Sequence, residues 1–441
     1  MMRKRTVWLS LLGFLLLGGV ALYVLYPRLI LAAHERFPKG VPDQLLYLVA
    51  TPLPTALPAP TAVANSEQLS VISDQLAQLQ PTATPTATLM PTFTPQSPIA
   101  NLQSPSPEPT ATSTPLPPTA MPLPTAVRLQ NIQIIPQKFN NCGPANLTIT
   151  LGYHGVEVDQ LNVGAAIKPN YDDRNVSPWE LVDYVNKETP MQAQFFVGGN
   201  LDLLKQLIAA GYPVIVEKGL YPNAWEGWMG HYLTMVGYDD ASREFISLDT
   251  FLGPWDNSGR RDNYESVDEF WQMFNHTFIL VYPPEDEADV LAMLPPELND
   301  PVAMWQTTAV ANQSLTTTQP DNPYAWFNLG SSLTHLAQLT NDDSLYTSAA
   351  AAFDQARTIG LPWRMLWYQF EPYEAYLANG RTDDIFTLSD AILSTEGGQN
   401  VEETYLYRSY AYAALGDEVN AEAALATALE LNPNLETAVS D

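Results

Sequence analysis

The chain has 441 residues, a formal net charge of −28 and a single cysteine. This length exceeds one ordinary hydrophobic core, so we expect at least two folded units. With 48 acidic residues against 20 basic ones, the composition argues against a nucleic acid partner, because phosphate binding needs clustered Lys and Arg. One cysteine excludes an intramolecular disulfide and a multi-thiolate metal site, and the sequence indicates no metal and no cofactor.

The first predicted element is an apolar run over residues 7–26, which follows three basic side chains in residues 1–6. About 20 apolar residues suffice to cross a bilayer, whereas the apolar part of a cleaved signal peptide has roughly 7–15. We therefore expect residues 7–26 to be a retained transmembrane signal anchor with residues 1–6 in the cytoplasm. Basic residues nearly balance across the span, so the expected extracytoplasmic position of the C-terminal domains rests on the stalk-like composition that follows.

Residues 27–127 are predicted to be a membrane-proximal segment and a disordered linker. Of the 38 prolines, 17 lie between Thr51 and Val127, mixed with Thr, Ala and Ser. Such a segment cannot bury enough apolar surface to offset its ordering entropy. Fully extended, about 75 such residues would reach roughly 200 Å. Apolar spacing within residues 69–79 predicts one short helix, which is too short to be stable alone.

The globular part of the chain is predicted to begin at Arg128, and Cys142 lies near its start. Pro144 fits the first turn of a helix, because its missing N–H costs nothing there, so the cysteine lies at a helix N-terminus. There the helix dipole and unpaired N–H groups lower the pKa of a thiol. A lone cysteine is more often a small buried hydrophobe, and the catalytic interpretation therefore needs a base and a group that orients it.

His231 and Asp249 are the predicted base and orienting residue. Residues 230–238 and 244–249 have the pattern of two strands. If they pair as a hairpin about residue 240, His231 lies opposite Asp249 with Cβ atoms roughly 5 Å apart. With Cys142, these residues would form a Cys/His/Asp triad.

Gln137 is the predicted oxyanion residue, since its uncharged amide and the Cys142 N–H would make a two-donor hole. His154 follows the cysteine by about three helical turns and is too far away to act as the base. His276 precedes a predicted strand and is expected to be structural. Trp225 and Trp228 lie in an aromatic loop, where we expect them to contact substrate; a position in the core is the alternative.

The residues around these positions resemble one known family. The resemblance rests on Gln137, the run Asn141-Cys142-Gly143-Pro144-Ala145, the run Gly230-His231-Tyr232 and the run Leu248-Asp249-Thr250. The sequence from 128 to 284 is similar to the bacteriocin-processing peptidase family of the papain clan, in its free-standing peptidase-like branch. The resemblance implies a papain-like α+β fold, with the cysteine-bearing helix packed on an antiparallel sheet, and implies the four catalytic roles given above. Relatives that trim double-glycine leaders are fused to an ATP-driven transporter, and this sequence has no phosphate-loop motif, so the substrate stays open.

Residues 285–320 are expected to connect this domain to an all-α repeat domain over residues 321–436. The spacing in the last segment matches the 34-residue tetratricopeptide pattern, at Tyr405, Tyr412, Gly416, Ala421, Leu425, Ala428 and Pro433. A first unit matches around Trp326 and Phe353 with an insertion near residues 340–344, and a weak middle unit over 363–394 keeps Gly380. We predict three helical hairpins that bind a protein or peptide; a purely structural cap is the alternative.

These elements together predict a single-pass protein of the cell membrane that hydrolyses peptide bonds as an extracytoplasmic cysteine peptidase. Its partners would be a peptide or protein substrate and a protein bound by the repeats. The alternative is a catalytically silent peptidase-like domain that acts with the repeats as a surface binding module. A third possibility is acyl transfer to an amine, which uses the same triad.

Overall fold

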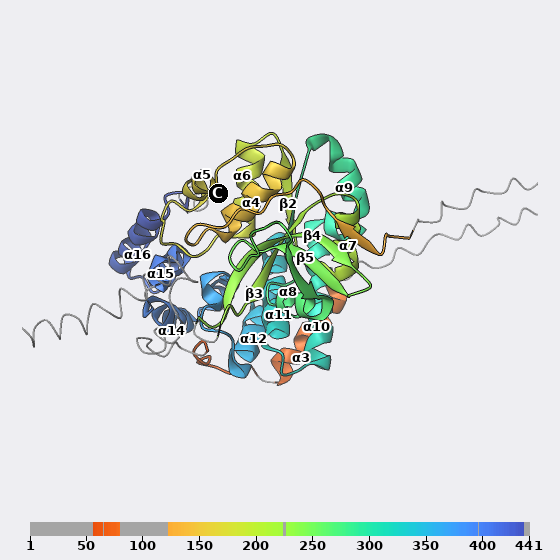
Figure 1. Cartoon of the computed structure of the whole chain (residues 1–441). Helices are drawn as coiled ribbons and strands as arrows, with labels where there is room; N and C mark the ends of the chain where they lie inside the picture. Colours follow the sequence, from red (N-terminus) through yellow and green to blue (C-terminus); the bar gives the residue numbers. More distant parts are fainter. Residues whose placement is uncertain (1–55, 65, 80–121, 224–225, 396, 436–441) are drawn as a thin grey trace, which may run out of the picture.

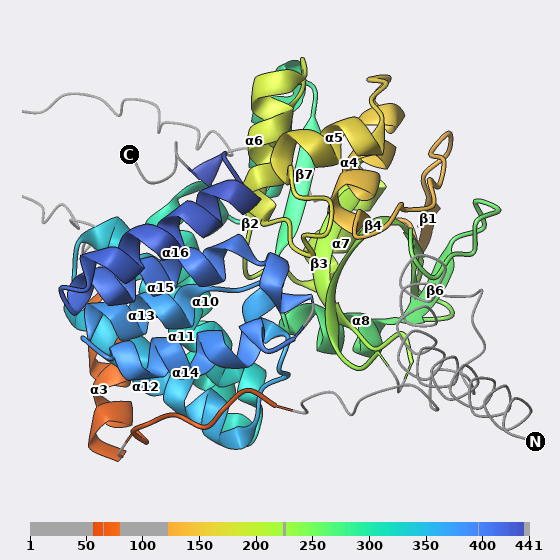
Figure 2. The same ribbon diagram turned by 90° about the vertical axis from the view of Figure 1, so that its left-hand side faces the viewer.

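The computed structural model describes residues 56–64, 66–79, 122–223, 226–395 and 397–435. The predicted anchor over residues 7–26 lies outside these ranges. Among the described helices, none combines the length and the apolar character needed to span a bilayer. The described chain forms a sheet-containing part and a helical part, which lie side by side (Figures 1 and 2).

The centre of the first part is a seven-stranded antiparallel sheet of order β2-β7-β3-β4-β5-β6, with β1 paired to β4. Its strands are β1 (Ala126–Arg128), β2 (Gln192–Phe196), β3 (Val214–Leu220), β4 (Met229–Asp239), β5 (Glu244–Leu248), β6 (Arg260–Asn263) and β7 (Phe278–Tyr282). Every residue of β3 and β7 is buried. Such uninterrupted burial requires cover on both faces of the sheet.

Two different sets of helices supply this cover. One face packs against α4 (Cys142–Tyr153), α5 (Gln160–Ile167) and α6 (Pro178–Glu188) around a separate hydrophobic cluster. The other face packs against α7 (Leu201–Ala209), α8 (Tyr264–Gln272) and the C-terminal helices. A capping box between Ser177 and Glu180 begins α6, and the Asn200 side chain caps α7, as their sequences predict.

The hairpin of β4 and β5 forms where expected, but the predicted register is wrong. Asp239 pairs with Glu244 and Thr234 pairs with Leu248, with a bulge between residues 235 and 237. The turn therefore centres beyond residue 240, and Asp249 lies just past the end of β5. His231 and Asp249 consequently meet diagonally at the end of the hairpin and are not a cross-strand pair.

The C-terminal part consists of antiparallel helices joined by short turns. They are α9 (Glu287–Met293), α10 (Pro301–Thr318), α11 (Pro323–Thr340), α12 (Ser344–Ile359), α13 (Glu371–Ala378), α14 (Thr382–Leu393), α15 (Glu402–Ala414) and α16 (Glu418–Leu431). Short 3-10 turns occur at η1 (Pro284–Asp286), η2 (Pro296–Asn299), η3 (Met365–Trp367) and η4 (Gly398–Asn400). The three predicted hairpins correspond to α11/α12, α13/α14 and α15/α16, and Gly380 and Gly416 make left-handed turns within the last two. That these hairpins are tetratricopeptide repeats stays a prediction.

Residues 285–320, which we expected to be a connector, are mostly helical and belong to the folded body. The longest element there is α10, which packs along α11. The sequence of α10 does not predict this packing, because its buried positions include polar residues such as Thr308, Asn312 and Thr316. Their polar groups are satisfied locally or across the interface: Thr308 donates to the Met304 carbonyl, and the Asn312 amide donates to the Asn275 side chain at 2.9 Å.

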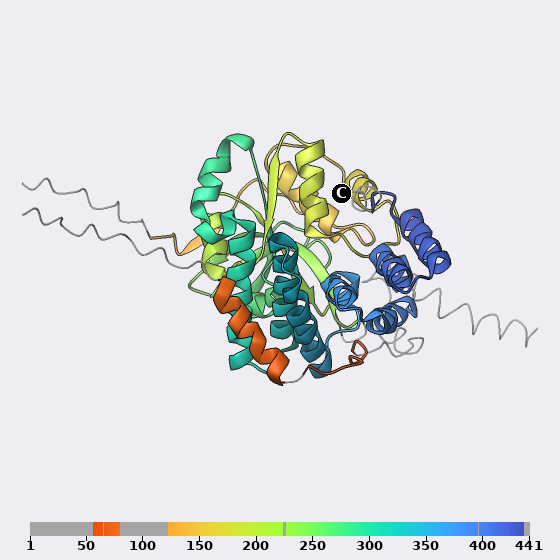
Figure 3. The ribbon, with the colours of Figure 1, turned by 180° about the vertical axis from the view of Figure 1, so that it is seen from behind.

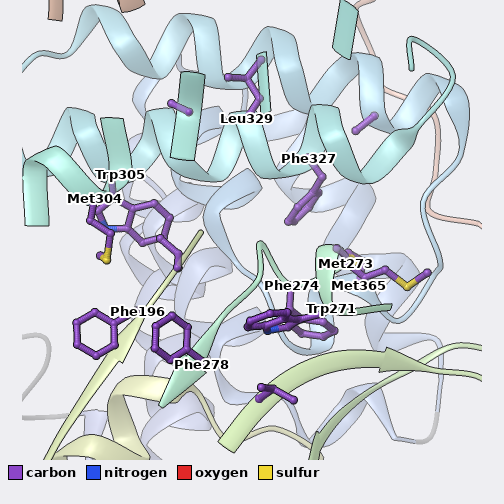
Figure 4. Close-up of a cluster of buried hydrophobic side chains, with 14 of the residues drawn as sticks. Phe196, Trp271, Met273, Phe274, Phe278, Met304, Trp305, Phe327, Leu329 and Met365 are labelled. Atoms are coloured by element: carbon purple, nitrogen blue, oxygen red, sulfur yellow. The ribbon is translucent and has the colours of Figure 1, made fainter. Parts of the chain in front are cut away.

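One hydrophobic core joins the helical part to the sheet. Figure 4 shows Phe196 and Phe278 of the sheet side facing Met304 and Trp305 of α10, and all four belong to the same buried cluster. Because side chains of both parts are close-packed in one interior, the sheet-containing part and the helical part form a single folded body. The helical part therefore has a fixed position relative to the sheet.

Part of the predicted disordered linker is packed against the helical part. Residues 66–79 form α3, which lies alongside α10 and α12 (Figure 3, orange) and buries Ile72 and Leu76. In the preceding segment 56–64, Leu57 donates its N–H to the Leu361 carbonyl at 2.9 Å. The short helix is thus stabilised by tertiary packing. The reach of roughly 200 Å that we expected for the whole segment is wrong, because only residues 27–55 separate the predicted anchor from this docked segment.

Candidate active site

Cys142 is the first residue of α4 and is half-buried. Two asparagines fix the start of this helix. The Asn141 amide donates to the Gln160 carbonyl of α5 at 2.7 Å, and the Asn146 amide donates to the Tyr232 carbonyl of β4 at 2.8 Å. The helix N-terminus is therefore tied to the strand that carries His231. Cys142 is placed as the sequence predicts, with its backbone N–H among the groups that lack an intrahelical partner.

His231 and Asp249 are in contact beneath the cysteine. Nε2 of His231 lies 3.1 Å from Oδ1 of Asp249, and both side chains are almost fully buried. The same carboxylate oxygen accepts hydrogen bonds from the backbone N–H groups of Phe251 and Leu252, and the second oxygen accepts a hydrogen bond from the Arg260 guanidinium at 3.3 Å. Asp249 is thus held in place by four donors, and His231 is free to turn its other nitrogen toward the thiol.

The three groups shift one another's pKa values in the directions that a nucleophilic pair requires. Burial alone would raise the pKa of the Cys142 thiol, but the hydrogen bond and charge of His231 lower it. Burial alone would lower the pKa of His231, but Asp249 and the thiolate raise it to about 9. Although burial opposes it, the positive charge of His231 keeps the pKa of Asp249 well below its usual range. An imidazolium and a carboxylate are therefore the favoured forms near neutral pH, and the thiol beside them ionises more readily than an ordinary thiol. We call Cys142, His231 and Asp249 the triad cluster.

Gln137 is held next to the triad cluster by the residue after Asp249. The Thr250 hydroxyl donates to Oε1 of Gln137 at 2.9 Å, and the Gln137 backbone N–H donates to the Thr250 carbonyl at 2.9 Å. Because Oε1 is engaged, the amide NH₂ is the end of the side chain that remains to act as a donor. This orientation is the one that the predicted oxyanion role needs. Thr250 is a positioning residue that the sequence argument did not single out.

The two predicted substrate-binding tryptophans have different outcomes. Trp225 lies outside the described residues. Trp228 is buried, stacked on Phe274 at a ring distance of 5.7 Å and in edge contact with Tyr368 at 5.8 Å. It belongs to the core between the sheet and the helical part, so the alternative interpretation of this residue is the one that the structure supports.

The two other histidines considered in the sequence analysis, His154 and His276, lie away from the triad cluster. His154 is the C-cap of α4, at the far end of the helix from Cys142. His276 pairs with the exposed Asp268 at 3.0 Å, on the loop before β7. Neither imidazole is part of the triad cluster.

Lys168 is a charged residue of this region that the sequence did not reveal. It is buried at the end of α5, and its Nζ donates to the Asp173 carbonyl at 2.8 Å. Its charge helps to lower the pKa of Cys142. It also faces a group of four buried or half-buried carboxyl groups from the peptidase-like part and α15, which we call the interface carboxyl cluster: Asp173, Glu180, Glu402 and Glu403. Glu403, the most distant member of the cluster, lies 235 positions from Lys168 in the sequence, so no local pattern could have predicted the cluster.

Comparison with known proteins assigns the same segment to a family. Residues 129–279 match the family described as "Peptidase_C39 like family", which confirms the resemblance for this third of the chain. Two solved structures are similar. A putative C39-like peptidase from Bacillus anthracis is 18% identical, and the match covers 35% of this chain and 96% of that chain with a TM-score of 0.29. The peptidase domain of Streptococcus ComA, a bifunctional ABC transporter involved in a quorum-sensing pathway, is 16% identical, and the match covers 35% of this chain and 99% of that chain with a TM-score of 0.27. No curated protein matches the chain.

The described chain is therefore a papain-like, C39 peptidase-like domain followed by a helical C-terminal region. The match covers the segment that contains Cys142, His231 and Asp249. It does not extend over the C-terminal helices, α3 or the apolar N-terminal run. The predicted roles of the individual site residues stay predictions.

Proposed function

We propose that this protein is a cysteine peptidase that hydrolyses peptide bonds with Cys142 as nucleophile, His231 as base and Asp249 as orienting residue. The observation that carries the proposal is the position of His231, buried between a thiol and a carboxylate that both raise its pKa. A structural cysteine in the core has no need of such a pair. The family match over residues 129–279 supports the same class of reaction.

The reaction follows from the charges of the triad cluster. The Cys142 thiolate attacks the carbonyl carbon of the scissile bond, and the resulting oxyanion accepts hydrogen bonds from the Cys142 N–H and the Gln137 amide. Imidazolium at His231 gives its proton to the leaving amine, which leaves a thioester on Cys142. Neutral His231 then takes a proton from water, whose oxygen attacks the thioester and releases the acid and the thiolate. Asp249 keeps the imidazole oriented throughout.

We also propose that residues 7–26 anchor the protein in the cell membrane with the folded body on the extracytoplasmic side. The length of the apolar run and the stalk-like composition after it support this arrangement. Because Leu57, Ile72 and Leu76 pack against the helical part, the body would lie within the length of residues 27–55 of the bilayer, at most about 100 Å. The helical region would then recruit a protein or peptide near the membrane surface.

The test of peptidase activity uses the full chain and a peptide library derived from proteome digests. New N-termini found by mass spectrometry should appear with the wild type and disappear with Cys142→Ala. Gln137→Ala should retain cleavage at a rate lower by about 10²-fold, as expected for the loss of one oxyanion donor. Cleavage that survives in Cys142→Ala would overturn the proposal. If the wild type cleaves nothing but retains bound peptides, the silent binding module becomes the better account.

A further inference from the structure

The connection between α12 and α13, residues 360–370, lies against the loop that leads into β4. The Arg364 guanidinium donates to the Glu226 carbonyl at 2.7 Å and to the Trp228 carbonyl at 3.4 Å. These are charge-assisted hydrogen bonds, which are shorter and stronger than neutral ones. The helical part is therefore bonded directly to the chain segment just before His231.

Tyr368 of this connection reaches the residue next to His231. Its ring lies 5.8 Å from the ring of Trp228 and 6.0 Å from that of Phe274. A Cβ at Gly230 would approach the Phe274 ring to 2.8 Å and the Tyr368 ring to 3.0 Å, both closer than ordinary van der Waals contact. Glycine at position 230 thus leaves room for a side chain from the helical part beside the catalytic histidine.

The Tyr368 hydroxyl is also within electrostatic reach of the nucleophile. Burial raises the pKa of Tyr368 to about 12; Arg364 opposes this rise and the charge on Cys142 adds to it. The hydroxyl therefore stays neutral at physiological pH, and its oxygen interacts with the backbone of Gly230. A half-buried aromatic ring with a neutral hydroxyl thus lies against Gly230, the residue that precedes His231.

The same connection contacts the loop on the other side of Cys142. The Arg174 guanidinium lies over the Phe139 ring at 5.4 Å and over the Trp367 ring at 5.7 Å. Phe139 precedes the cysteine by three residues, in the loop that also carries Gln137. Trp367, through Arg174, and Tyr368, at Gly230, therefore lie beside the two chain segments that carry Cys142 and His231.

We propose that Tyr368 forms one wall of the substrate cleft and limits the size of the substrate side chain beside the scissile bond. The inference rests on the proposed peptidase function. A small, uncharged side chain fits against the ring and the neutral hydroxyl, whereas a bulky one meets the ring that already contacts Gly230. The helical region therefore determines specificity directly, in addition to any partner it recruits.

Alkylation of Cys142 with electrophiles of two sizes tests this steric role. Iodoacetamide and an N-naphthyl iodoacetamide are compared at pH 8.5, where an ordinary thiol ionises without help. Tyr368→Ala should raise the rate of the bulky reagent relative to the small one by about tenfold or more, because pocket size discriminates at this level. Tyr368→Phe should leave the ratio within about twofold, since the ring remains. Tyr346→Ala on α12 is the matched control and should not change the ratio.

Two results would overturn the proposal: an unchanged ratio in Tyr368→Ala, or an equal rise for both reagents, which would mean that Tyr368 covers the thiol without selecting by size. The outcome is separable from the proposed function. If catalysis is wrong, labelling at pH 6 will not depend on His231 while the size ratio still responds to Tyr368. If the wall is wrong, labelling will depend on His231 and the ratio will not respond.

A measurement on the wild type covers the case in which Tyr368→Ala does not fold. A haloacetamide that carries a short diazirine is attached to Cys142 and photolysed, and the crosslinked tryptic peptides are identified by mass spectrometry. We expect crosslinks to the peptide of residues 365–381, which contains Tyr368. Crosslinks confined to residues 122–300 would contradict the composite cleft.

Discussion

Two clusters of buried charge both interact with Lys168 and are built in opposite ways. In the triad cluster, the imidazolium lies between two groups that are negative when ionised, and Asp249 accepts Arg260 and two backbone N–H groups as well. In the interface carboxyl cluster, one buried ammonium acts on Asp173, Glu180 and Glu402, with the half-exposed Arg174 also near it, and Glu403 is affected by the other carboxyl groups. One carboxyl oxygen of Glu402 and one of Glu403 have no hydrogen-bond partner among the described residues.

The consequence is a difference in the direction of the pKa shifts. Despite burial, pairing keeps the pKa of Asp249 well below its usual range. Burial and mutual repulsion raise the pKa values of Asp173, Glu180 and Glu403 well above theirs. Burial alone therefore does not decide whether a carboxyl group can act as a charge; the partners do. The first cluster is suited to catalysis, and the second makes the contact between the two parts sensitive to protons.

The largest expected effect comes from removing the charge of the triad cluster. Asp249→Asn should lower kcat by on the order of 10³-fold or more, because the imidazole loses both its orientation and its stabilising charge. The pKa of His231 should fall from about 9 toward its ordinary value. Peptide hydrolysis and the pH dependence of thiol labelling measure the two effects.

The exposed pair of Asp268 and His276, at 3.0 Å, is the matched control for that substitution. Asp268→Asn changes the same chemical group in the same kind of pair, but away from a thiol. It should leave kcat unchanged. An Asp249→Asn variant that keeps activity within about threefold of the wild type would mean that the two Asp–His pairs are equivalent, and the comparison between the clusters would fail.

A smaller effect is expected from removing the cation shared by the interface carboxyl cluster. Lys168→Met should lower the free energy of unfolding at pH 7.5 by about 3 kcal/mol, as is typical when one partner of a buried charge pair is lost. The loss should shrink as the pH falls, because carboxyl groups with raised pKa values take up protons first and then no longer need the cation. Urea unfolding at both pH values measures it. Lys187→Met, which removes an exposed lysine paired with Asp183, should cost less than about 0.5 kcal/mol, and equal losses in the two variants would contradict the account.

The smallest effect concerns the pH dependence of stability. Because the pKa of Glu403 is raised on folding, the folded state holds a proton that the unfolded state has released above about pH 4.5, and stability falls as pH rises above that value. The lowered pKa of Asp249 acts below about pH 4 and does not contribute in this window. Glu403→Gln should therefore lose less of its free energy of unfolding than the wild type between pH 5 and pH 8.

The corresponding measurement is urea unfolding of both proteins across this range, with the exposed Glu265→Gln as control. Parallel curves for the wild type and Glu403→Gln would show that the interface carboxyl cluster does not take up protons on folding. A flatter curve only in Glu403→Gln is the predicted result.

The sequence was sufficient for features that depend on neighbours along the chain. Pro144 and the apolar spacing after it placed Cys142 at a helix start, and the turn at residues 239–244 placed two strands beside each other. The contact between His231 and Asp249 was predicted correctly from a register that was wrong. A bulge and a shifted turn moved the strand pairing by two to three residues. The side chains of His231 and Asp249 nevertheless meet at the end of the hairpin.

Features that depend on distant partners could not be predicted in this way. The composition of residues 56–79 predicts disorder, yet Arg357 supplies hydrogen bonds to the carbonyls of Pro58 and Ala59, and α12 supplies an apolar surface for α3. Likewise, Tyr368 has no local signature of a site residue. Its position depends on how the helical part packs against the sheet. The sequence of either segment alone does not predict this packing.

The central claim is that Cys142 and His231 form a thiolate–imidazolium pair, and the pH profile of iodoacetamide labelling tests it most directly. The wild type should label rapidly and almost evenly from pH 6 to pH 8, since the thiol pKa is lowered and that of His231 is raised. His231→Ala should label on the order of 10²-fold more slowly at pH 6 and rise with an ordinary thiol pKa of about 8.5. Superimposable profiles for the two proteins would contradict the account.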